Sequence, residues 1–337
     1  RANRISPWNK FVIQGEASVK RIFKGVSATA IAILMAQGSH SYAAPKPGEV
    51  ESHLLSLIQQ FSLTKVDEEA CLHDIRRGLN GKRGKKCFGQ FDRIIGGWQE
   101  ERAHREWQEA SKTVTVDVPG DWAYVKIERF GLTTADEFYS ALSGIKQQRI
   151  IIDLRQNGGG RLDQAIKMAL MVVDPGGNAP VYTETKRDSE TQDFRLITKT
   201  FHVQELADRF FSEQRDRVGS LRDKHFAILI NDHTFSACEI LAEIMRRLNP
   251  DNVFLVGRQT FGKWTAQAWF PFQDAEGNKR RLGYTVLRYA PGSDKAPPEH
   301  VKPDYKRTYN LRREGELGVA SDTVYTFAIR RLLSRTE

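Results

Sequence analysis

Two short and almost wholly apolar segments constrain the fold of this chain more than any other feature. They lie at residues 150–154 and 226–230, and each has the length of a strand. Runs of this kind are typical of strands that are buried on both faces of a parallel sheet. A turn and then apolar residues at helical spacing follow each run, so the order strand, turn, helix occurs twice. The pattern predicts an α/β fold in which both turns open on the same edge of one sheet.

The second turn carries a serine, and a lysine follows the next apolar run. Ser236 stands where the helical period begins, and residues 253–256 lead through a glycine-containing loop to Lys263. A neutral lysine amine can accept the proton of a serine hydroxyl where burial lowers the pKa of the lysine. The segment therefore predicts nucleophilic catalysis, with Ser236 as nucleophile and Lys263 as base. The alternative is that Ser236 and Glu239 form only a capping box, which satisfies the first amides of the helix.

Two glycine patterns suggest nucleotide binding, and both are incomplete. The segment from Gly257 to Lys263 matches the phosphate-binding pattern G-x-x-x-x-G-K, but Trp264 stands where Ser or Thr would hold magnesium. Residues 158–160 begin a dinucleotide pattern, but Asp163 occupies the position of its last glycine. Three glycines before a helix let backbone amides approach a ligand, and the helix dipole adds positive potential, which suits an oxyanion. The alternative is a tight turn that serves helix packing alone.

Four ordered motifs, taken together, resemble the tail-specific or carboxyl-terminal processing serine peptidases of peptidase family S41. The motifs are Asp153-Leu-Arg-Gln-Asn-Gly-Gly-Gly160, Phe235-Ser-Ala-Cys-Glu-Ile240, Gly257-Arg-Gln-Thr-Phe-Gly-Lys263 with Gln267, and Arg288-Tyr-Ala-Pro-Gly292 followed by Pro303-Asp304. They cover about residues 122–304. The resemblance implies an α/β fold with a ClpP/crotonase-like core of stacked strand-strand-helix units.

The same resemblance implies roles for five residues. Ser236 would be the nucleophile, Lys263 the general base, and Gln267 the residue that positions the lysine amine. The backbone amides of Gly160 and Ala237 would form the oxyanion hole. A histidine base is the alternative to Lys263, but none of the eight histidines comes with an identifiable orienting carboxylate.

The chain divides into four predicted parts. These are a signal peptide at residues 1–43, a helical amino-terminal region at 44–112, an S41-like catalytic core at 113–310 and a carboxyl-terminal helical segment at 311–337. The family often carries a PDZ domain before its core. The amino-terminal region has helical spacing and no strand-rich stretch of that size, so a PDZ groove is not expected to select the substrate.

The first residues predict export. Basic residues precede an apolar run at 25–35, and Ser41 and Ala43 are small enough for a signal peptidase to cut after Ala43. A short membrane anchor is the alternative, but the run is far shorter than the roughly 20 residues that a spanning helix needs. No other stretch is long and apolar enough to span a membrane. We expect an exported protein, periplasmic or extracellular in a bacterium.

Charge and cysteine content exclude further classes of function. The formal net charge is +9, but residues 1–43 supply more than half of it, with six Lys or Arg and one Glu. The remainder has no basic stripe interleaved with aromatic residues, so no nucleic-acid partner is expected. Cys71 and Cys87 could pair in an oxidising compartment. Together with His73 they match no zinc pattern, and we expect neither a metal nor a cofactor.

The sequence thus predicts a serine endopeptidase with a Ser/Lys dyad that cuts unfolded or carboxyl-terminal protein segments. Its expected partner is a protein or peptide substrate, and the oligomeric state is not predicted. The alternative is a catalytically silent peptide-binding or scaffolding protein of the same fold. The presence of Ser236, Lys263 and Gln267 together favours the enzyme.

Overall fold

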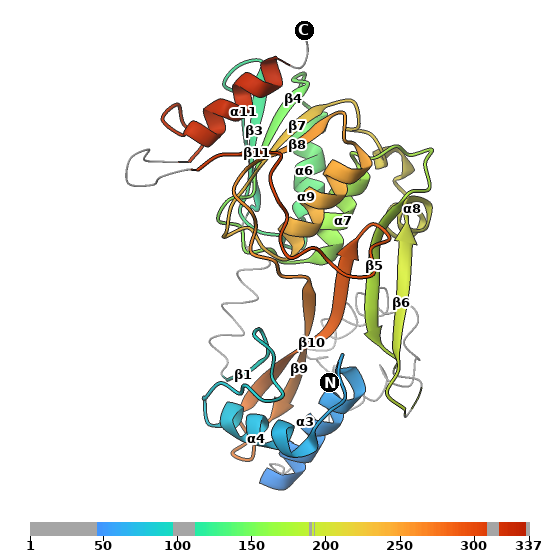
Figure 1. Cartoon of the computed structure of the whole chain (residues 1–337), viewed down its shortest axis with the longest axis vertical. Coiled ribbons are helices and arrows are strands. Elements are labelled where there is room, and N and C mark those ends of the chain that lie inside the picture. The colour runs from blue at the N-terminus through green and yellow to red at the C-terminus, as the bar shows by residue number, and fades with distance from the viewer. Residues whose placement is uncertain (1–45, 97–111, 189–190, 192, 309–316, 335–337) are drawn as a thin grey trace, which may run out of the picture.

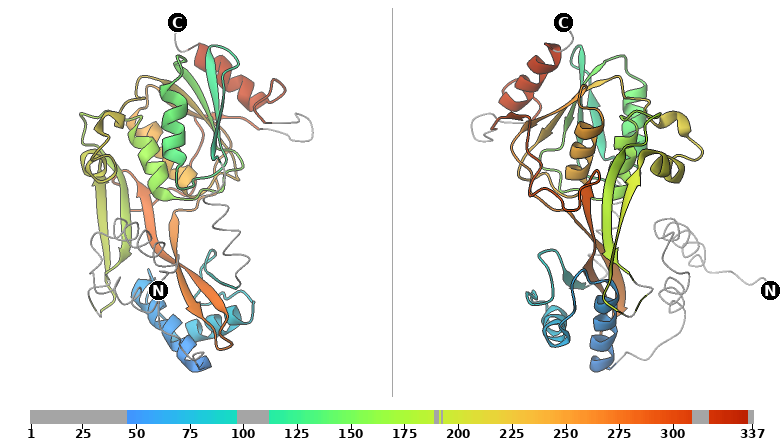
Figure 2. Two further views of the ribbon diagram at one scale, coloured as in Figure 1. Left: turned by 180° about the vertical axis from the view of Figure 1, so that it is seen from behind. Right: turned by 45° about the vertical axis from the view of Figure 1, so that its right-hand side comes forward.

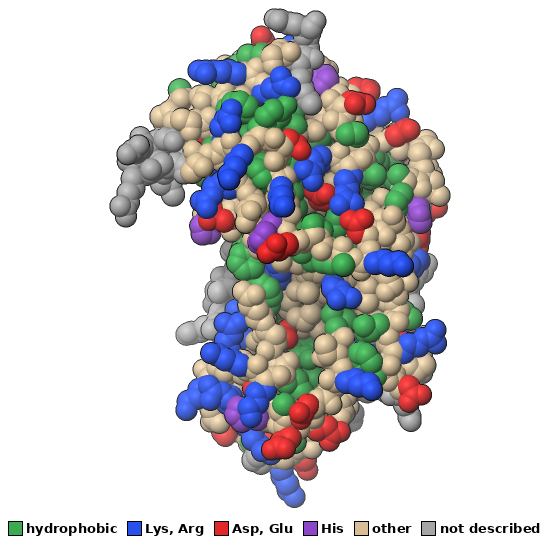
Figure 3. Space-filling view, in the orientation of Figure 1, with side chains coloured by type: hydrophobic (Ala, Val, Ile, Leu, Met, Phe, Trp, Pro, Cys, Tyr) green, Lys and Arg blue, Asp and Glu red, His purple; other side chains and the backbone are tan. Residues whose placement is uncertain are grey.

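The computed structural model of the chain describes residues 46–96, 112–188, 191, 193–308 and 317–334. The predicted signal peptide lies outside these residues. The described chain forms two bodies, one above the other in Figure 1. The core body contains a six-stranded sheet and its helices, and the N-terminal body contains the first two helices. A five-stranded sheet runs from one body to the other, and Figure 3 shows that the molecule narrows between them.

The six-stranded sheet has the strand order β11-β8-β7-β4-β3-β2. Its strands are β2 (Val114–Asp117), β3 (Trp122–Ile127), β4 (Arg149–Asp153), β7 (His225–Ile230), β8 (Val253–Gly257) and β11 (Tyr305–Lys306). All neighbours pair in parallel except β2 and β3, which are antiparallel. The two apolar runs form β4 and β7 of one sheet, as the sequence predicted, and the structure shows that these strands are direct neighbours.

Helices cover both faces of this sheet (Figure 2). They are α6 (Thr134–Ser143), α7 (Leu162–Leu170) and α9 (Ala237–Leu248) on one face and α11 (Thr323–Leu333) on the other. Ile150 and Ile152 of β4 belong to the core with the first three helices, whereas Ile151 belongs to the core with α11. Because both faces are buried, the central strands need apolar residues at nearly every position.

The five-stranded sheet is built around one long strand, β10 (Lys279–Pro291). Its other strands are β1 (Arg93–Gly96), β5 (Pro180–Arg187), β6 (Leu196–His202) and β9 (Thr265–Gln273). β9 pairs along most of β10, while β1 pairs with the first part of β10 and β5 with the last part. The loop between β8 and β9 (residues 258–264) carries Lys263 and is called the lysine loop below. The two sheets meet at this loop.

The N-terminal body packs on the lower ends of β9 and β10 (Figure 1). Its helices are α3 (Pro47–Phe61) and α4 (Glu68–Leu79). Their contact with the strands buries a small apolar cluster that includes Leu54, Ile58, Ile75, Phe270 and Leu282. A disulfide between Cys71 and Cys87 ties α4 to the segment that precedes β1.

Several details differ from the sequence-based expectation. The amino-terminal region contains the strand β1 besides its helices, and β5 was not expected. The segment after β6 contains the helix α8 (Val203–Phe210) and a separate 3-10 turn (Arg215–Arg217). Asp322 caps α11 and accepts the N–H groups of Val324 and Tyr325. None of the helices among the described residues combines the length and the apolar character needed to cross a membrane.

Candidate active site

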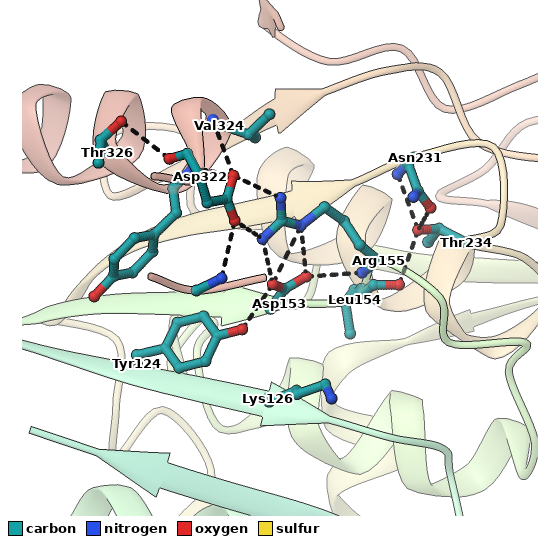
Figure 4. A network of polar contacts seen from close by, with 12 residues as sticks. Tyr124, Lys126, Asp153, Leu154, Arg155, Asn231, Thr234, Asp322, Val324 and Thr326 are labelled. Atoms are coloured by element: carbon teal, nitrogen blue, oxygen red, sulfur yellow. Dashed lines mark hydrogen bonds and ion pairs between the residues drawn. The ribbon is translucent and has the colours of Figure 1, made fainter. Parts of the chain in front are cut away.

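Two turns meet at the carboxyl edge of the six-stranded sheet. The glycine turn (residues 154–160) follows β4, and the serine turn (residues 231–236) follows β7. The Thr234 hydroxyl donates to the Leu154 carbonyl at 2.9 Å, which ties one turn to the other (Figure 4). The predicted meeting of the two turns is therefore present.

Ser236 has an unusual backbone conformation, with φ 63° and ψ −122°. Among the described residues, Gln156 is the only other non-glycine residue with a positive φ. Such a conformation costs roughly 1–3 kcal/mol and persists only where the surroundings enforce it. An ordinary N-cap residue has an extended backbone. The capping-box contacts between Ser236 and Glu239 are present, but a cap does not require a positive φ, so capping alone does not explain this conformation.

Glu239 links the serine turn to the lysine loop. Its side chain is fully buried. Oε2 accepts the N–H groups of Ser236 and Lys263, both at 2.8 Å. Oε1 accepts hydrogen bonds from the Thr260 hydroxyl and the Gly262 N–H. One carboxylate thus fixes the backbone of both predicted catalytic residues, a role that the capping-box pattern did not indicate.

Lys263 lies half-buried in the loop that Glu239 holds. Its amino group lies 4.6 Å from the centre of the Phe91 ring. Burial lowers the pKa of Lys263, and the positive charge of Arg93 adds to this effect, whereas the carboxylates of Glu239 and Asp92 oppose it. A lower pKa increases the fraction of neutral amine, which is the form that can accept a proton.

Tyr289 connects the serine and the lysine. Its buried hydroxyl donates to the Lys263 carbonyl at 3.2 Å. Burial raises the pKa of Tyr289, and a hydrogen bond with the Ser236 side chain opposes the rise. The sequence placed Tyr289 in the fourth motif but gave it no role. Among the described residues, no direct hydrogen bond joins Lys263 Nζ to Ser236, and such bonds often tighten only when substrate binds.

Gln267 lies on β9, directly opposite Thr285 on β10. Its Nε2 donates to the hydroxyl oxygens of Thr285 at 3.0 Å and Thr265 at 3.3 Å. These two bonds orient the side-chain amide. In the described part of the chain, no hydrogen bond joins Gln267 to Lys263, so its predicted role stays a prediction.

The glycine turn packs directly on the start of α9. A Cβ on Gly159 would lie 2.8 Å from Ser236 Cβ and 3.1 Å from the Ala237 nitrogen. A Cβ on Gly160 would lie 2.3 Å from the Phe130 oxygen. The turn can therefore approach α9 and Phe130 this closely only with glycine at both positions.

The amides of Gly160 and Ala237 have no role in the nearby backbone pairing. Phe130 bridges to the glycine turn through Gly159 O and Arg161 N, which leaves out the Gly160 N–H. The Ala237 N–H is the first of α9 and has no acceptor within the helix. Within the described residues, both amides can therefore donate to a ligand oxygen.

A buried ionic network connects the start of the glycine turn to the start of α11 (Figure 4). Arg155 forms ion pairs with Asp153 and Asp322, both at 2.6 Å, and all three side chains are almost fully buried. The Tyr124 hydroxyl donates to Asp153 at 2.8 Å. Because Asp322 also caps α11, this network joins the carboxyl-terminal helix to the start of the glycine turn. The sequence analysis did not indicate this ion pair.

Two other reactive side chains lie near the turns. The Cys238 thiol is fully buried and bonds to the Asn157 carbonyl at 3.2 Å, and burial raises the pKa of the thiol. His233, a candidate for a histidine base, is exposed in the serine turn. The part of the chain that the structure describes contains no group of three or more His, Cys, Asp or Glu suited to a metal ion.

The sequence profile of "Peptidase family S41" matches residues 121–307, more than half of the chain. The chain belongs to peptidase family S41. All five predicted site residues lie within the matched segment of this S41 member. The predicted family and fold class are thus confirmed.

Two curated relatives and one solved structure illustrate the similarity. A "Probable CtpA-like serine protease" of Staphylococcus saprophyticus is 27% identical over 254 residues, which is 72% of this chain and 46% of the relative. A protein with the same description from Staphylococcus epidermidis is 28% identical over 197 residues, 57% of this chain and 35% of the relative. The S41 chain described here therefore spans less than half the length of these relatives.

The solved structure of a lipoprotein from Streptococcus agalactiae superposes with a TM-score of 0.62 and 14% sequence identity. The match covers 88% of this chain and 99% of that chain. It includes much of the chain outside the S41 segment. At this identity the similarity shows a shared fold alone.

Proposed function

We propose that this chain is a serine endopeptidase in which Ser236 and Lys263 form the catalytic dyad. The observation that carries the proposal is the strained, positive-φ backbone of Ser236. The Glu239 carboxylate maintains this backbone and at the same time holds the amide of Lys263. A scaffolding protein would have no use for a strained serine whose surroundings are shared with a lysine of lowered pKa.

The proposed reaction begins when Ser236 Oγ attacks the carbonyl carbon of the substrate peptide bond. Its proton passes to the neutral amine of Lys263. The negative charge that forms on the carbonyl oxygen is stabilised by the amides of Gly160 and Ala237. The C–N bond then breaks, and the leaving amine takes the proton from Lys263, which leaves an ester on Ser236. Water hydrolyses this ester with Lys263 as base and restores the serine.

The proposed substrates are unfolded or carboxyl-terminal segments of proteins. We also propose that the protein is exported. The signal-like residues at 1–43 support this location, as does the disulfide between Cys71 and Cys87, because structural disulfides persist in oxidising compartments.

The test is cleavage of denatured, fluorescently labelled casein by the purified chain. Ser236→Ala and Lys263→Ala should each lower the cleavage rate at least about 1,000-fold, because each removes one half of the proton transfer. Lys224→Ala is the matched control. Lys224 is another lysine of lowered pKa, and its amine donates to the backbone carbonyls of Ile145 and Gln147, beside the start of β7 and not beside the serine turn at its end. Wild-type cleavage by a folded Ser236→Ala protein would refute the dyad and favour a scaffolding role.

A further inference from the structure

The segment just before β1 reaches the candidate site from the N-terminal body. It precedes residue 121, where the match to the family begins. The ring of Phe91 lies against Lys263 Nζ and makes an edge contact with Phe261, with ring centres 6.1 Å apart. The charges of Asp92 and Arg93 act on the pKa of Lys263 in opposite directions. The N-terminal body therefore contributes to the surroundings of the lysine.

Asp92 makes the most specific contact of this segment. Its side chain is 3% exposed. Oδ1 accepts both the N–H and the hydroxyl of Thr285, each at 2.7 Å, and Oδ2 accepts the Gly89 N–H at 2.8 Å. The backbone pairing of β1 with β10 runs from Arg93 and ends at Gly283. Beyond the last residue pair of β1 and β10, the Asp92 carboxylate thus accepts the Thr285 N–H in place of a backbone carbonyl of β1.

The contact fixes the direction of a hydrogen-bond chain. A carboxylate can only accept, so the Thr285 hydroxyl must donate its proton to Asp92. The Thr285 oxygen is then an acceptor, and Gln267 Nε2 donates to it at 3.0 Å. With its nitrogen engaged by threonine hydroxyls, Gln267 keeps its carbonyl oxygen as the atom that can accept from a lysine amine.

We propose that Asp92 is a positioning residue for the catalytic lysine and acts through Thr285 and Gln267. The N-terminal body thereby completes the active site instead of only packing beside it. The proposal rests on the proposed Ser236/Lys263 dyad, since this series of hydrogen bonds ends at Gln267, the residue predicted to orient Lys263. It adds to that dyad a residue from outside the family segment.

The test compares the pH dependence of kcat and KM for casein cleavage among variants of the complete chain. Thr285→Val removes the hydroxyl at nearly constant shape, and kcat should fall on the order of 10- to 100-fold while KM stays within about twofold. Thr285→Ser keeps the hydroxyl and should restore most of the activity. Asp92→Asn should lower kcat similarly. It should also move the acid limb of the profile to lower pH, because a negative charge that raises the pKa of Lys263 is lost.

Asp274→Asn is the matched control. Asp274 is another buried aspartate of the five-stranded sheet, 2% exposed, and it binds Arg280 and the turn between β9 and β10. This variant should melt at a lower temperature without any change in the acid limb. If Asp274→Asn lowers kcat as much as Asp92→Asn does, the effect is general destabilisation and the proposal is wrong.

Two further outcomes separate this proposal from the proposed function. Normal kcat in a folded Thr285→Val protein, with Ser236→Ala inactive, would overturn the positioning role and leave the dyad intact. Equal cleavage by wild type and Ser236→Ala would instead overturn the dyad, and the positioning role with it. If Asp92→Asn does not fold, the comparison of Thr285→Val with Thr285→Ser still decides the question.

Discussion

The glycine turn and the serine turn have the same topology and different means of support. Each follows a central parallel strand, precedes a helix and contains one non-glycine residue of positive φ, Gln156 or Ser236. The glycine turn is anchored from behind by Arg155, whose ionic network extends to the carboxyl-terminal helix. The serine turn is anchored by Glu239, whose carboxylate extends to the lysine loop.

This difference assigns different tasks to the two turns. The ionic network lies on the side of the sheet where α11 packs, and its hydrogen bonds run to Asp322 at the start of that helix, so it can hold the turn rigid without entering the proposed reaction. Glu239 instead contacts the backbone of both dyad residues. Damage to Glu239 should therefore reduce catalysis as well as stability, whereas damage to the Arg155 network should reduce stability and leave catalysis nearly unchanged.

The largest expected effect comes from Glu239→Gln. The amide has one acceptor oxygen in place of two, so some of the four donors that Glu239 satisfies are left buried without a partner. We expect a loss of more than about 3 kcal/mol in the free energy of unfolding. Because the backbone of Ser236 and Lys263 shifts, kcat should fall at least about 100-fold.

Glu243→Gln controls for the loss of a buried glutamate on the same helix. Glu243 lies one turn further along α9 and pairs with Arg246 and Arg247, away from the dyad. Urea unfolding and casein cleavage, measured on both variants, test whether Glu239 has a special role in catalysis. Equal losses of kcat in the two variants would contradict a special role for Glu239.

The rate of cleavage, which depends on Lys263, and the stability supplied by the Arg155 network should also change in different pH ranges. In the proposed mechanism cleavage requires neutral Lys263, whose pKa is lowered by burial, so the rate should rise with pH by up to tenfold per unit and level off below the usual lysine value of about 10.4. Asp322 has a lowered pKa, because its hydrogen bonds and ion pair with Arg155 outweigh desolvation. Its contribution to stability is present above about pH 4 and is lost as the pH falls further.

Rate profiles and thermal melts over the same pH range check this separation. If stability is lost over the same pH range in which the rate falls, the rate profile reflects unfolding and not the titration of Lys263. A rate controlled by one group near pH 6.5 and removed by His233→Ala would indicate a histidine base instead.

The edge of the sheet where Ser236 and Lys263 lie could be predicted from the sequence, because it depends on local order. Ser236 and Lys263 each follow an apolar strand, and the carboxyl ends of neighbouring parallel strands share one edge of a sheet. The glycine turn could be predicted for the same reason, since a run of glycines before a helix is visible in any single segment.

The supports of the dyad could not be predicted, because they depend on contacts between distant segments. Glu239 matched a capping box and gave no sign of its bond to Lys263, 24 positions away. Asp92 and Thr285 are 193 positions apart. The short strand β1 was missed because its formation depends on pairing with β10, and strand propensity is decided by such context.

Asp322→Asn tests the anchor of the glycine turn. Asparagine caps a helix about as well as aspartate, so the variant removes the ion pair and keeps the cap. Breaking one partner of a buried pair should cost about 3 kcal/mol in unfolding free energy. Because Arg155 keeps Asp153, the turn stays in place, and kcat should change less than about fivefold.

Asp67→Asn provides the comparison for Asp322→Asn. Asp67 caps α4 through the Ala70 N–H and lies at the surface, so its replacement should change stability by less than about 0.5 kcal/mol. A loss of kcat in Asp322→Asn as large as that in Glu239→Gln would remove the distinction between the two anchors.

The smallest expected effect comes from Gln156→Gly, which tests the two positive-φ residues against each other. Gln156 has φ 66° and its side chain is exposed. Glycine adopts this φ without strain, and the relief should exceed the added entropy of the unfolded chain, giving a gain of roughly 1 kcal/mol. Cleavage should not change, because the side chain has no part in the proposed reaction. Ser236→Gly should relieve the same strain and lose all cleavage. If Gln156→Gly lowers kcat in a protein of unchanged or higher stability, the strain in the glycine turn is itself part of the active site, and the two turns differ less than their anchors suggest.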